Sequence, residues 1–176
     1  MAGTEDLQAI RFNVLRNALY HQARRRFLER VSRILNFAII MLGTGAVAAA
    51  IPRFGVSAWI GVAVAAIGAL QLVYDFSRRA AEHASLQRDY FRLLAEIEEK
   101  ETADPGDIAR WRAAMLRLSA DEPPVLKAVD AIAYNAAADA MELPEGERLL
   151  VPMRVKAIAH LFGFDDHRFV KRAEVV

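Results

Sequence analysis

The chain holds few residues in arrangements that support catalysis or metal binding. Its four histidines are His21, His83, His160 and His167. No two of them lie four residues apart, which is the spacing of two metal ligands on one face of a helix. Asp165-Asp166-His167 could supply metal ligands, but such a cluster after a glycine is typical of a solvated loop or a helix cap. Because the sequence has no cysteine, it offers no thiolate site and no disulfide. We therefore expect no metal, no cofactor and no enzymatic activity.

One short motif looks superficially like part of a phosphate-binding loop. Gly43-Thr44-Gly45 lacks the wider glycine spacing and the Lys-Ser/Thr ending of such loops, and it lies inside an uncharged stretch. The acidic residues between positions 96 and 101 are typical of the wet face of a helix. These motifs select no reaction.

Two long uncharged stretches determine the class of the protein. Ile34–Ile51 contains 18 residues without a charge and Phe54–Tyr74 contains 21, and only Pro52 and Arg53 separate them. As helices they would extend roughly 27 and 31 Å, which matches a hydrocarbon core of about 30 Å. Both are apolar around the whole helix, as lipid-facing segments are. The sequence therefore predicts a transmembrane hairpin with spans at 34–51 and 54–74.

Two other readings of these stretches are a buried helical pair in a soluble core and a cleaved signal peptide. Ala46-Val47-Ala48 resembles a cleavage site, but the segment before the apolar stretch would be 33 residues long and a second span follows at once. The whole chain of 176 residues is 55% hydrophobic and has a formal charge of only +1. This composition favours the membrane and disfavours nucleic acid as a partner.

Arginines flank the hairpin on one side of the expected membrane. We expect them to contact lipid head groups and to keep both termini cytoplasmic, since the connecting turn holds Arg53 alone. The candidates for head-group contact are Arg24, Arg25, Arg26, Arg30 and Arg33 before the first span and Arg78 and Arg79 after the second.

Helical periodicity extends beyond both spans. Residues 5–33 and 77–100 contain no proline or glycine, and each carries an apolar stripe that could bury the other stripe or a neighbouring subunit. Shorter helices are predicted at 108–118, from about Pro124 to Met141, and between Pro152 and Gly163. We predict an all-α membrane protein, a two-helix transmembrane hairpin with long helical extensions and a small cytoplasmic helical domain. Its parts are a cytoplasmic helix at 1–33, the hairpin at 34–74 and a cytoplasmic helical region at 75–176.

Small and polar residues inside the spans are candidates for helix packing or for lining a pore. Gly61, Ala65 and Ala69 recur every four positions and form a small-residue stripe that allows close helix packing. Gly43 and Gly45 are small residues of the same kind in the first span. Asn36 and Gln71 should lie at similar depth, where they can hydrogen-bond within the hairpin. Thr44 lies near mid-span, where its hydroxyl either bonds back to its own helix or faces a wet path. Because two spans cannot enclose a water path alone, conduction would require a homo-oligomer.

Four segments resemble the bacterial SLATT proteins, the two-transmembrane effector domains associated with nucleotide second-messenger and SLOG sensor systems. The segments are Leu15–Phe27 (LRNALYHQARRRF), Leu70–Phe76 (LQLVYDF), Glu122-Pro123-Pro124 and Ala133-Tyr134-Asn135. The resemblance implies an effector of the bacterial inner membrane that forms pores when a sensor is activated. Its trigger would be a separate sensor protein or a nucleotide second messenger, because no nucleotide-synthesising or nucleotide-sensing domain is recognisable here.

Three functions follow as hypotheses. The first is an oligomeric pore-forming effector of bacterial defence, held closed until a partner or ligand biases an open state. The second is a membrane scaffold that recruits a cytoplasmic partner and conducts nothing. The third is a holin-like protein, which the long region after the second span disfavours.

Overall fold

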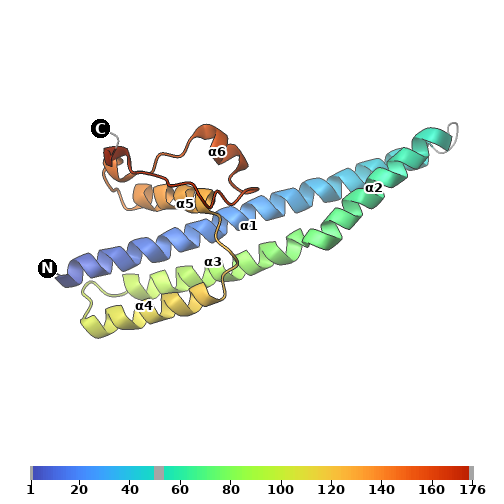
Figure 1. The fold of residues 1–176 in the computed structure, drawn as a ribbon. Helices are drawn as coiled ribbons and strands as arrows, with labels where there is room; N and C mark the ends of the chain where they lie inside the picture. The colour runs from blue at the N-terminus through green and yellow to red at the C-terminus, as the bar shows by residue number, and fades with distance from the viewer. Residues whose placement is uncertain (1, 50–53, 175–176) are drawn as a thin grey trace. The chain divides into compact units, whose positions relative to one another are not determined.

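The computed structural model describes residues 2–49 and 54–174, with the side chains of residues 4–44 and 59–174. Helices account for 78% of the chain, and the described residues form no strand beyond an isolated antiparallel bridge between Leu149 and Lys171. The predicted all-α class is confirmed. In order, the elements are α1 (Ala2–Ala49), α2 (Phe54–Tyr74), α3 (Phe76–Glu98), α4 (Pro105–Ala120), α5 (Lys127–Ala140), η1 (Glu145–Glu147), α6 (Met153–Ile158) and η2 (Arg172–Glu174) (Figure 1).

Most helix boundaries follow the sequence signals. The helix predicted over 5–33 continues without a break into the first apolar stretch as α1, and the helix predicted over 77–100 is α3. At the start of α4, the side chain of Asp104 accepts from the Asp107 backbone while Asp107 bonds back, which forms a capping box.

The predicted start of α5 at Pro124 is wrong. The helix begins three residues later at Lys127, because Leu126 is extended and gives its backbone N–H to the Tyr20 hydroxyl, at 3.0 Å. The backbone N–H of Lys127 likewise bonds the carbonyl of Gly163 at 3.2 Å. A pair of prolines also pushes the residue before each of them toward extended conformations. Tertiary hydrogen bonds therefore set this boundary. The last helix, α6, begins directly after Pro152 as predicted but ends at Ile158, five residues before the predicted close at Gly163.

The chain forms two compact units. Unit 1 comprises Met1–Arg24 and His83–Val176, and unit 2 comprises Arg25–Glu82. The boundaries predicted at residues 33 and 75 divide membrane-spanning segments from segments in water. The boundaries of the two units instead follow the contacts within the chain.

Unit 1 has two apolar clusters, one on each side of the N-terminal part of α1. The first joins α1, α3 and α4 around the fully buried Val14, Tyr90 and Trp111. The second joins Tyr20 to the alanine-rich face of α5 and to Ala159 after α6. The apolar stripes predicted on the two long helices therefore bury each other within the chain, although a neighbouring subunit was the alternative.

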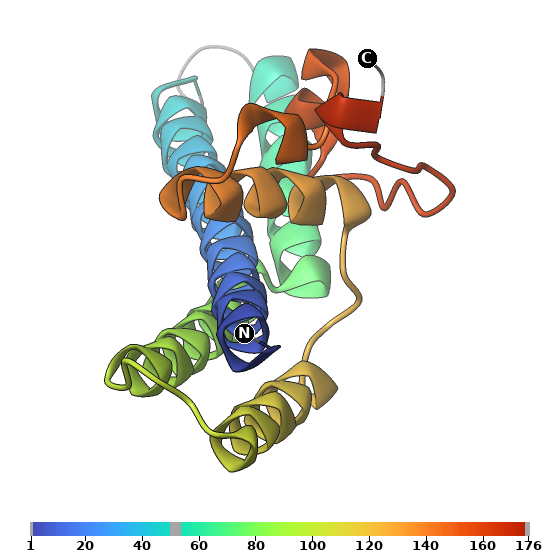
Figure 2. The same cartoon turned by 90° about the vertical axis from the view of Figure 1, so that its left-hand side faces the viewer.

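Unit 2 is built on the second part of α1 and on α2, which lie side by side in both views (Figures 1 and 2). The half-buried positions of α2 recur at helical spacing and mark the face packed on α1; they are Ile60, Ala63, Val64, Ile67, Gly68 and Gln71. Between α2 and α3, Asp75 takes a left-handed conformation with φ 41°. Its carboxylate accepts from the Arg78 backbone N–H at 3.2 Å and so caps the new helix.

Candidate functional site

The outer surface of unit 2 consists largely of exposed apolar side chains, which are unfavourable in water. Exposed large side chains cover α2 and the facing part of α1, and Trp59 and Leu72 are 77% and 84% exposed. The members of this surface with described side chains include Ile34, Phe37, Ile40, Met41, Val62, Leu70 and Val73. Contiguous apolar patches of this kind mark membrane or protein contacts.

One helical stretch among the described residues is long and apolar enough to cross a membrane. It lies within Trp59–Glu98, and none of its most apolar window is buried inside the chain. This stretch includes most of the predicted second span. The end of the predicted first span, the surroundings of Gly45 and the turn at Pro52 and Arg53 lie outside the described residues.

The predicted small-residue stripe of α2 lies on the free surface of the helix. Gly61, Ala65 and Ala69 are all exposed, and a methyl group added at Gly61 would meet nothing within 4 Å. Gly43 in α1 is half-buried but is similarly uncrowded. Gly68 is half-buried on the face of α2 that turns toward α1, although a methyl group added there would also meet nothing within 4 Å. The stripe therefore does not hold α1 and α2 together and is available to another molecule.

Three described polar side chains of the predicted spans form hydrogen bonds within the chain. The Gln71 side-chain amide donates to the Asn36 carbonyl oxygen at 3.1 Å, as we expected from their similar depth. The Thr44 hydroxyl bonds back to the carbonyls of Ile40 and Met41, both at 3.0 Å. Near the end of α2, Ser32 and Ser77 hydroxyls lie 3.1 Å apart beside a polar pocket of about 100 Å³.

The arginines expected at the head groups differ in their surroundings. Arg25 and Arg33 both bond Glu29, and Arg78 bonds Asp75 and Glu82. Arg26, Arg30 and Arg79 are exposed, and the guanidinium of Arg79 lies over the Tyr74 ring, 5.9 Å from its centroid. Arg24, in unit 1, is half-buried and donates to the carbonyl oxygen of His160 at 2.8 Å. It therefore also fixes the segment after α6.

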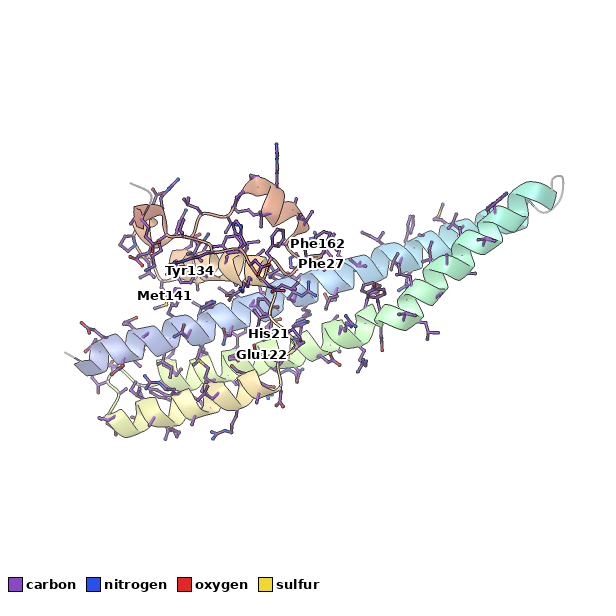
Figure 3. The ribbon with its side chains drawn as sticks, in the orientation of Figure 1. His21, Phe27, Glu122, Tyr134, Met141 and Phe162 are labelled. Carbon is purple, nitrogen blue, oxygen red and sulfur yellow. The ribbon has the colours of Figure 1, made fainter. Side chains whose placement is uncertain are left out.

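Unit 1 contains a buried polar cluster, which we define as His21, His83, Tyr90 and Glu122. The Nδ1 atoms of His21 and His83 lie 2.8 Å apart, and both side chains are buried. His21 on α1 and Glu122 after α4 approach each other, with Nε2 3.3 Å from Oε1, as an ion pair without hydrogen-bond geometry (Figure 3). The rings of His21 and Tyr90 are stacked with centroids 5.6 Å apart.

Glu122 is the acceptor at the centre of this cluster. The Tyr90 hydroxyl donates to its Oε1 and lies 3.0 Å from the Ser119 hydroxyl. Burial raises the pKa of the Glu122 carboxyl, but the interactions with His21 and Tyr90 outweigh it and hold the pKa below its ordinary value. Burial and the bond to Glu122 raise the pKa of Tyr90. Burial, followed by the field of His21, lowers the pKa of His83 to about 4.

Sequence reasoning missed this cluster because its members come from three distant segments. One signal was present, since His21 continues the apolar stripe of the first helix. Among the described residues no group of three side chains is suited to hold a metal. The cluster is a buried hydrogen-bonded network and offers no open catalytic surface.

The Asp165-Asp166-His167 segment lies at the surface of unit 1. All three residues are exposed beside an open pocket of about 420 Å³ that Lys127 and Asp130 also line. The Lys127 ammonium group donates to the carbonyl oxygen of Asp165. This is the solvated loop that the sequence favoured.

Comparisons of the chain with protein-family models, with curated proteins and with solved structures find no match. The resemblance to SLATT proteins accordingly stays a prediction.

Proposed function

We propose that this chain is a two-span membrane effector whose protomers associate through the exposed small-residue face of α2 and permeabilise the bilayer when assembled. In this proposal the spans are residues 34–51 and 54–74, the membrane is the bacterial inner membrane, and both termini are cytoplasmic. The observation that carries the proposal is the position of Gly61, Ala65 and Ala69 on the free face of an apolar helix.

The exposed apolar side chains support insertion into lipid. A hydrophobic residue at the centre of a membrane helix contributes roughly 0.3 to 0.6 kcal/mol, whereas one charge costs about 3 kcal/mol. The described part of α2, from Trp59 to Tyr74, carries no charge at all. In water the same surface would be an aggregation site.

The small-residue face supports assembly. In lipid, helices associate mainly through close van der Waals packing, which small side chains at four-residue spacing permit. Because the packing between α1 and α2 uses other positions, the stripe can meet a second protomer without disturbing the first helix pair. An oligomer of such pairs is the minimum arrangement that could surround a water path.

A trigger would act on unit 1. An effector that stays closed until it is needed must have two states, and a ligand shifts them only by binding one state better than the other. The resemblance to SLATT proteins suggests a separate sensor protein or a nucleotide second messenger in this role.

One observation favours the second candidate, a membrane scaffold that conducts nothing. The described polar side chains of the spans, Asn36, Thr44 and Gln71, are already bonded within the protomer. A pore would therefore be lined by backbone and small side chains, or these bonds would have to exchange on opening. The holin-like alternative has no such support.

Dye release from liposomes tests the proposal. Purified protein is reconstituted at rising protein-to-lipid ratio, so that mass action drives assembly in place of a trigger. Release of a self-quenched dye is compared with membrane potential in cells that express the protein. We expect release that rises steeply with protein density and is lost in Ala65→Leu, which separates the helices at the stripe.

Two further variants sharpen this assay. Ala66→Leu places the same side chain one position on, beside Val62 and Leu70, and is expected to release dye like the wild type. Thr44→Val is also expected to keep release, because its hydroxyl is satisfied by its own helix. Wild-type protein that inserts and cross-links but leaves liposomes sealed and cells polarised would support the scaffold.

A further inference from the structure

The boundary between α2 and α3 is a single residue, Asp75, in a left-handed backbone conformation. Its φ of 41° is unfavourable for a residue with a Cβ, although aspartate tolerates such values better than most residues. Helical hydrogen bonds continue on both sides. The Asp75 N–H bonds the Gln71 carbonyl at 2.9 Å, and the Asp75 carbonyl accepts from the Arg79 N–H at 3.1 Å. The break therefore interrupts an otherwise continuous helical path.

No helix-breaking residue explains this interruption. Residues 69–104 contain neither glycine nor proline, the usual causes of a sharp break in a helix. The side chain of Asp75 provides the cause instead. Its Oδ1 accepts from the Arg78 backbone N–H at 3.2 Å, and its Oδ2 accepts from the Arg78 Nε at 3.0 Å. In a continuous helix, this N–H would bond the Tyr74 carbonyl.

Two opposing contributions of similar size meet at Asp75. The left-handed conformation costs free energy, and a carboxylate cap on the first turn of a helix regains about as much. A straight helix would avoid the cost and restore the regular hydrogen bonds, but it would lose the cap. The broken and straight forms of this segment therefore differ little in local free energy, as the two states of a hinge must.

The contacts on either side of Asp75 require the break. Gln71 bonds Asn36 at 3.1 Å, and the Ser77 hydroxyl lies 3.1 Å from the Ser32 hydroxyl, so both residues face α1. In a continuous helix, residues six positions apart point roughly 120° away from each other around the axis. Gln71 and Ser77 could then not both face α1. The polar pocket of about 100 Å³ lies among these four side chains and is also lined by Asp75.

We propose that Asp75 is a hinge: its carboxylate keeps α2 and α3 separate in the closed state, and the two join into one straight helix when the effector opens. Joining breaks the bond at Ser77 or at Gln71, and so frees polar side chains that the closed protomer keeps to itself. α3 continues from the hinge into unit 1, which includes His83 and the residues after it. The assignment to opening rests on the proposed function, whereas the hinge itself does not.

Residual dipolar couplings of isotope-labelled protein in bicelles test the hinge. The N–H couplings of α2 and α3 follow one continuous helix when the segment is straight and two separate helices when it is broken. Asp75→Asn keeps both a side-chain acceptor and the tolerance for a left-handed backbone, whereas Asp75→Ala loses both. We expect two helices in the wild type and in Asp75→Asn, and one continuous helix in Asp75→Ala.

Asp89→Ala is the matched control. Asp89 also bonds an arginine three residues further on, Arg92, but within the regular part of α3, so its loss should leave the break in place. A break in Asp75→Ala equal to that in Asp75→Asn overturns the hinge, because packing alone would then hold the helices apart. Relaxation dispersion in the wild type needs no variant and should show exchange at the amides of Phe76 and Ser77. Flat profiles at both amides overturn the hinge as well.

The same variants in the dye-release assay test the assignment to opening. Asp75→Ala should lower the protein-to-lipid ratio for half-maximal release about fivefold, the factor that corresponds to one lost cap, and Asp75→Asn should match the wild type. A straight helix in Asp75→Ala with unchanged release overturns the assignment of the straight form to the open state. If the wild type releases no dye at any density, the proposed function fails, while the dipolar couplings still decide on the hinge.

Discussion

The Nδ1 atoms of His21 and His83 face each other at 2.8 Å inside unit 1. Only one hydrogen fits between two nitrogens at this distance, so one ring donates and the other accepts. The two imidazoles therefore cannot both be protonated in the native packing. With its pKa lowered to about 4, His83 is neutral at physiological pH.

This relationship makes the stability of unit 1 sensitive to acid. The pKa of His83 is about 4 in the native state and 6.5 when unperturbed, so the unfolded state binds more protons between these values. The stability is fully present above pH 6.5 and is lost as the pH falls to about 4. The loss would reach roughly 3 kcal/mol from a shift of this size. Other groups that face the pair are Glu122 and Arg24; the lowered pKa of Glu122 adds a loss at still lower pH.

Denaturation in detergent at several pH values measures this dependence, followed by Trp111 fluorescence in a Trp59→Phe background. His83→Gln should flatten the curve between pH 6.5 and 4, whereas His167→Gln in the exposed loop should leave it unchanged. An equally steep curve in His83→Gln would assign the acid sensitivity to another group.

Tyr90→Phe should destabilise unit 1 by roughly 1 to 3 kcal/mol, because it removes the hydroxyl donor from the largely buried Glu122 carboxylate. The ring and its packing remain, so the loss reports the hydroxyl. Tyr74→Phe is the matched control, since Tyr74 is exposed, and it should change the free energy of unfolding little. Equal stability of the two variants would mean that water replaces the hydroxyl at Glu122.

Asn135 fixes the C-terminal segment to α5. Its side chain accepts from the Leu149 backbone N–H at 2.7 Å and donates to the Leu149 carbonyl oxygen at 2.8 Å. Asn135→Ala should remove both bonds and speed hydrogen exchange at the Leu149 amide, with a cost of roughly 1 to 3 kcal/mol. Asn135→Asp keeps the acceptor and should give an intermediate rate. Wild-type exchange in Asn135→Ala would show that the bridge between Leu149 and Lys171 suffices.

The helices of this protein were predictable because their signals are local. A break-free stretch before the apolar residues predicts a long α1, and Pro152 marks the start of α6. The start of α5 was not predictable in this way, because the Gly163 carbonyl accepts from the Lys127 N–H, which a helix beginning at Pro124 would use for its first internal bond, and the Tyr20 hydroxyl binds the N–H of the extended Leu126. Those partners are distant in sequence.

The candidate site was likewise predictable only where its signals are local. Spacing along α2 predicts that Gly61, Ala65 and Ala69 share one face, but a helix that is apolar all around does not reveal which face packs on α1. The buried cluster could not be predicted from spacing, because its contacts depend on the register of α1 against α3 and on the course of the chain after α4, which places Glu122. A histidine on an apolar stripe is a weak signal by itself.

Cysteine cross-linking within membranes tests most directly the central claim that the free face of α2 is where protomers meet. Ala65→Cys lies on the exposed stripe and Ala63→Cys on the half-buried face toward α1, in a chain with no other cysteine. After alkaline extraction that retains only integral proteins, oxidation should give a disulfide-linked dimer with Ala65→Cys and little with Ala63→Cys. Absence of the Ala65→Cys chain from the extracted membranes, or dimers formed equally by both variants, would contradict the account.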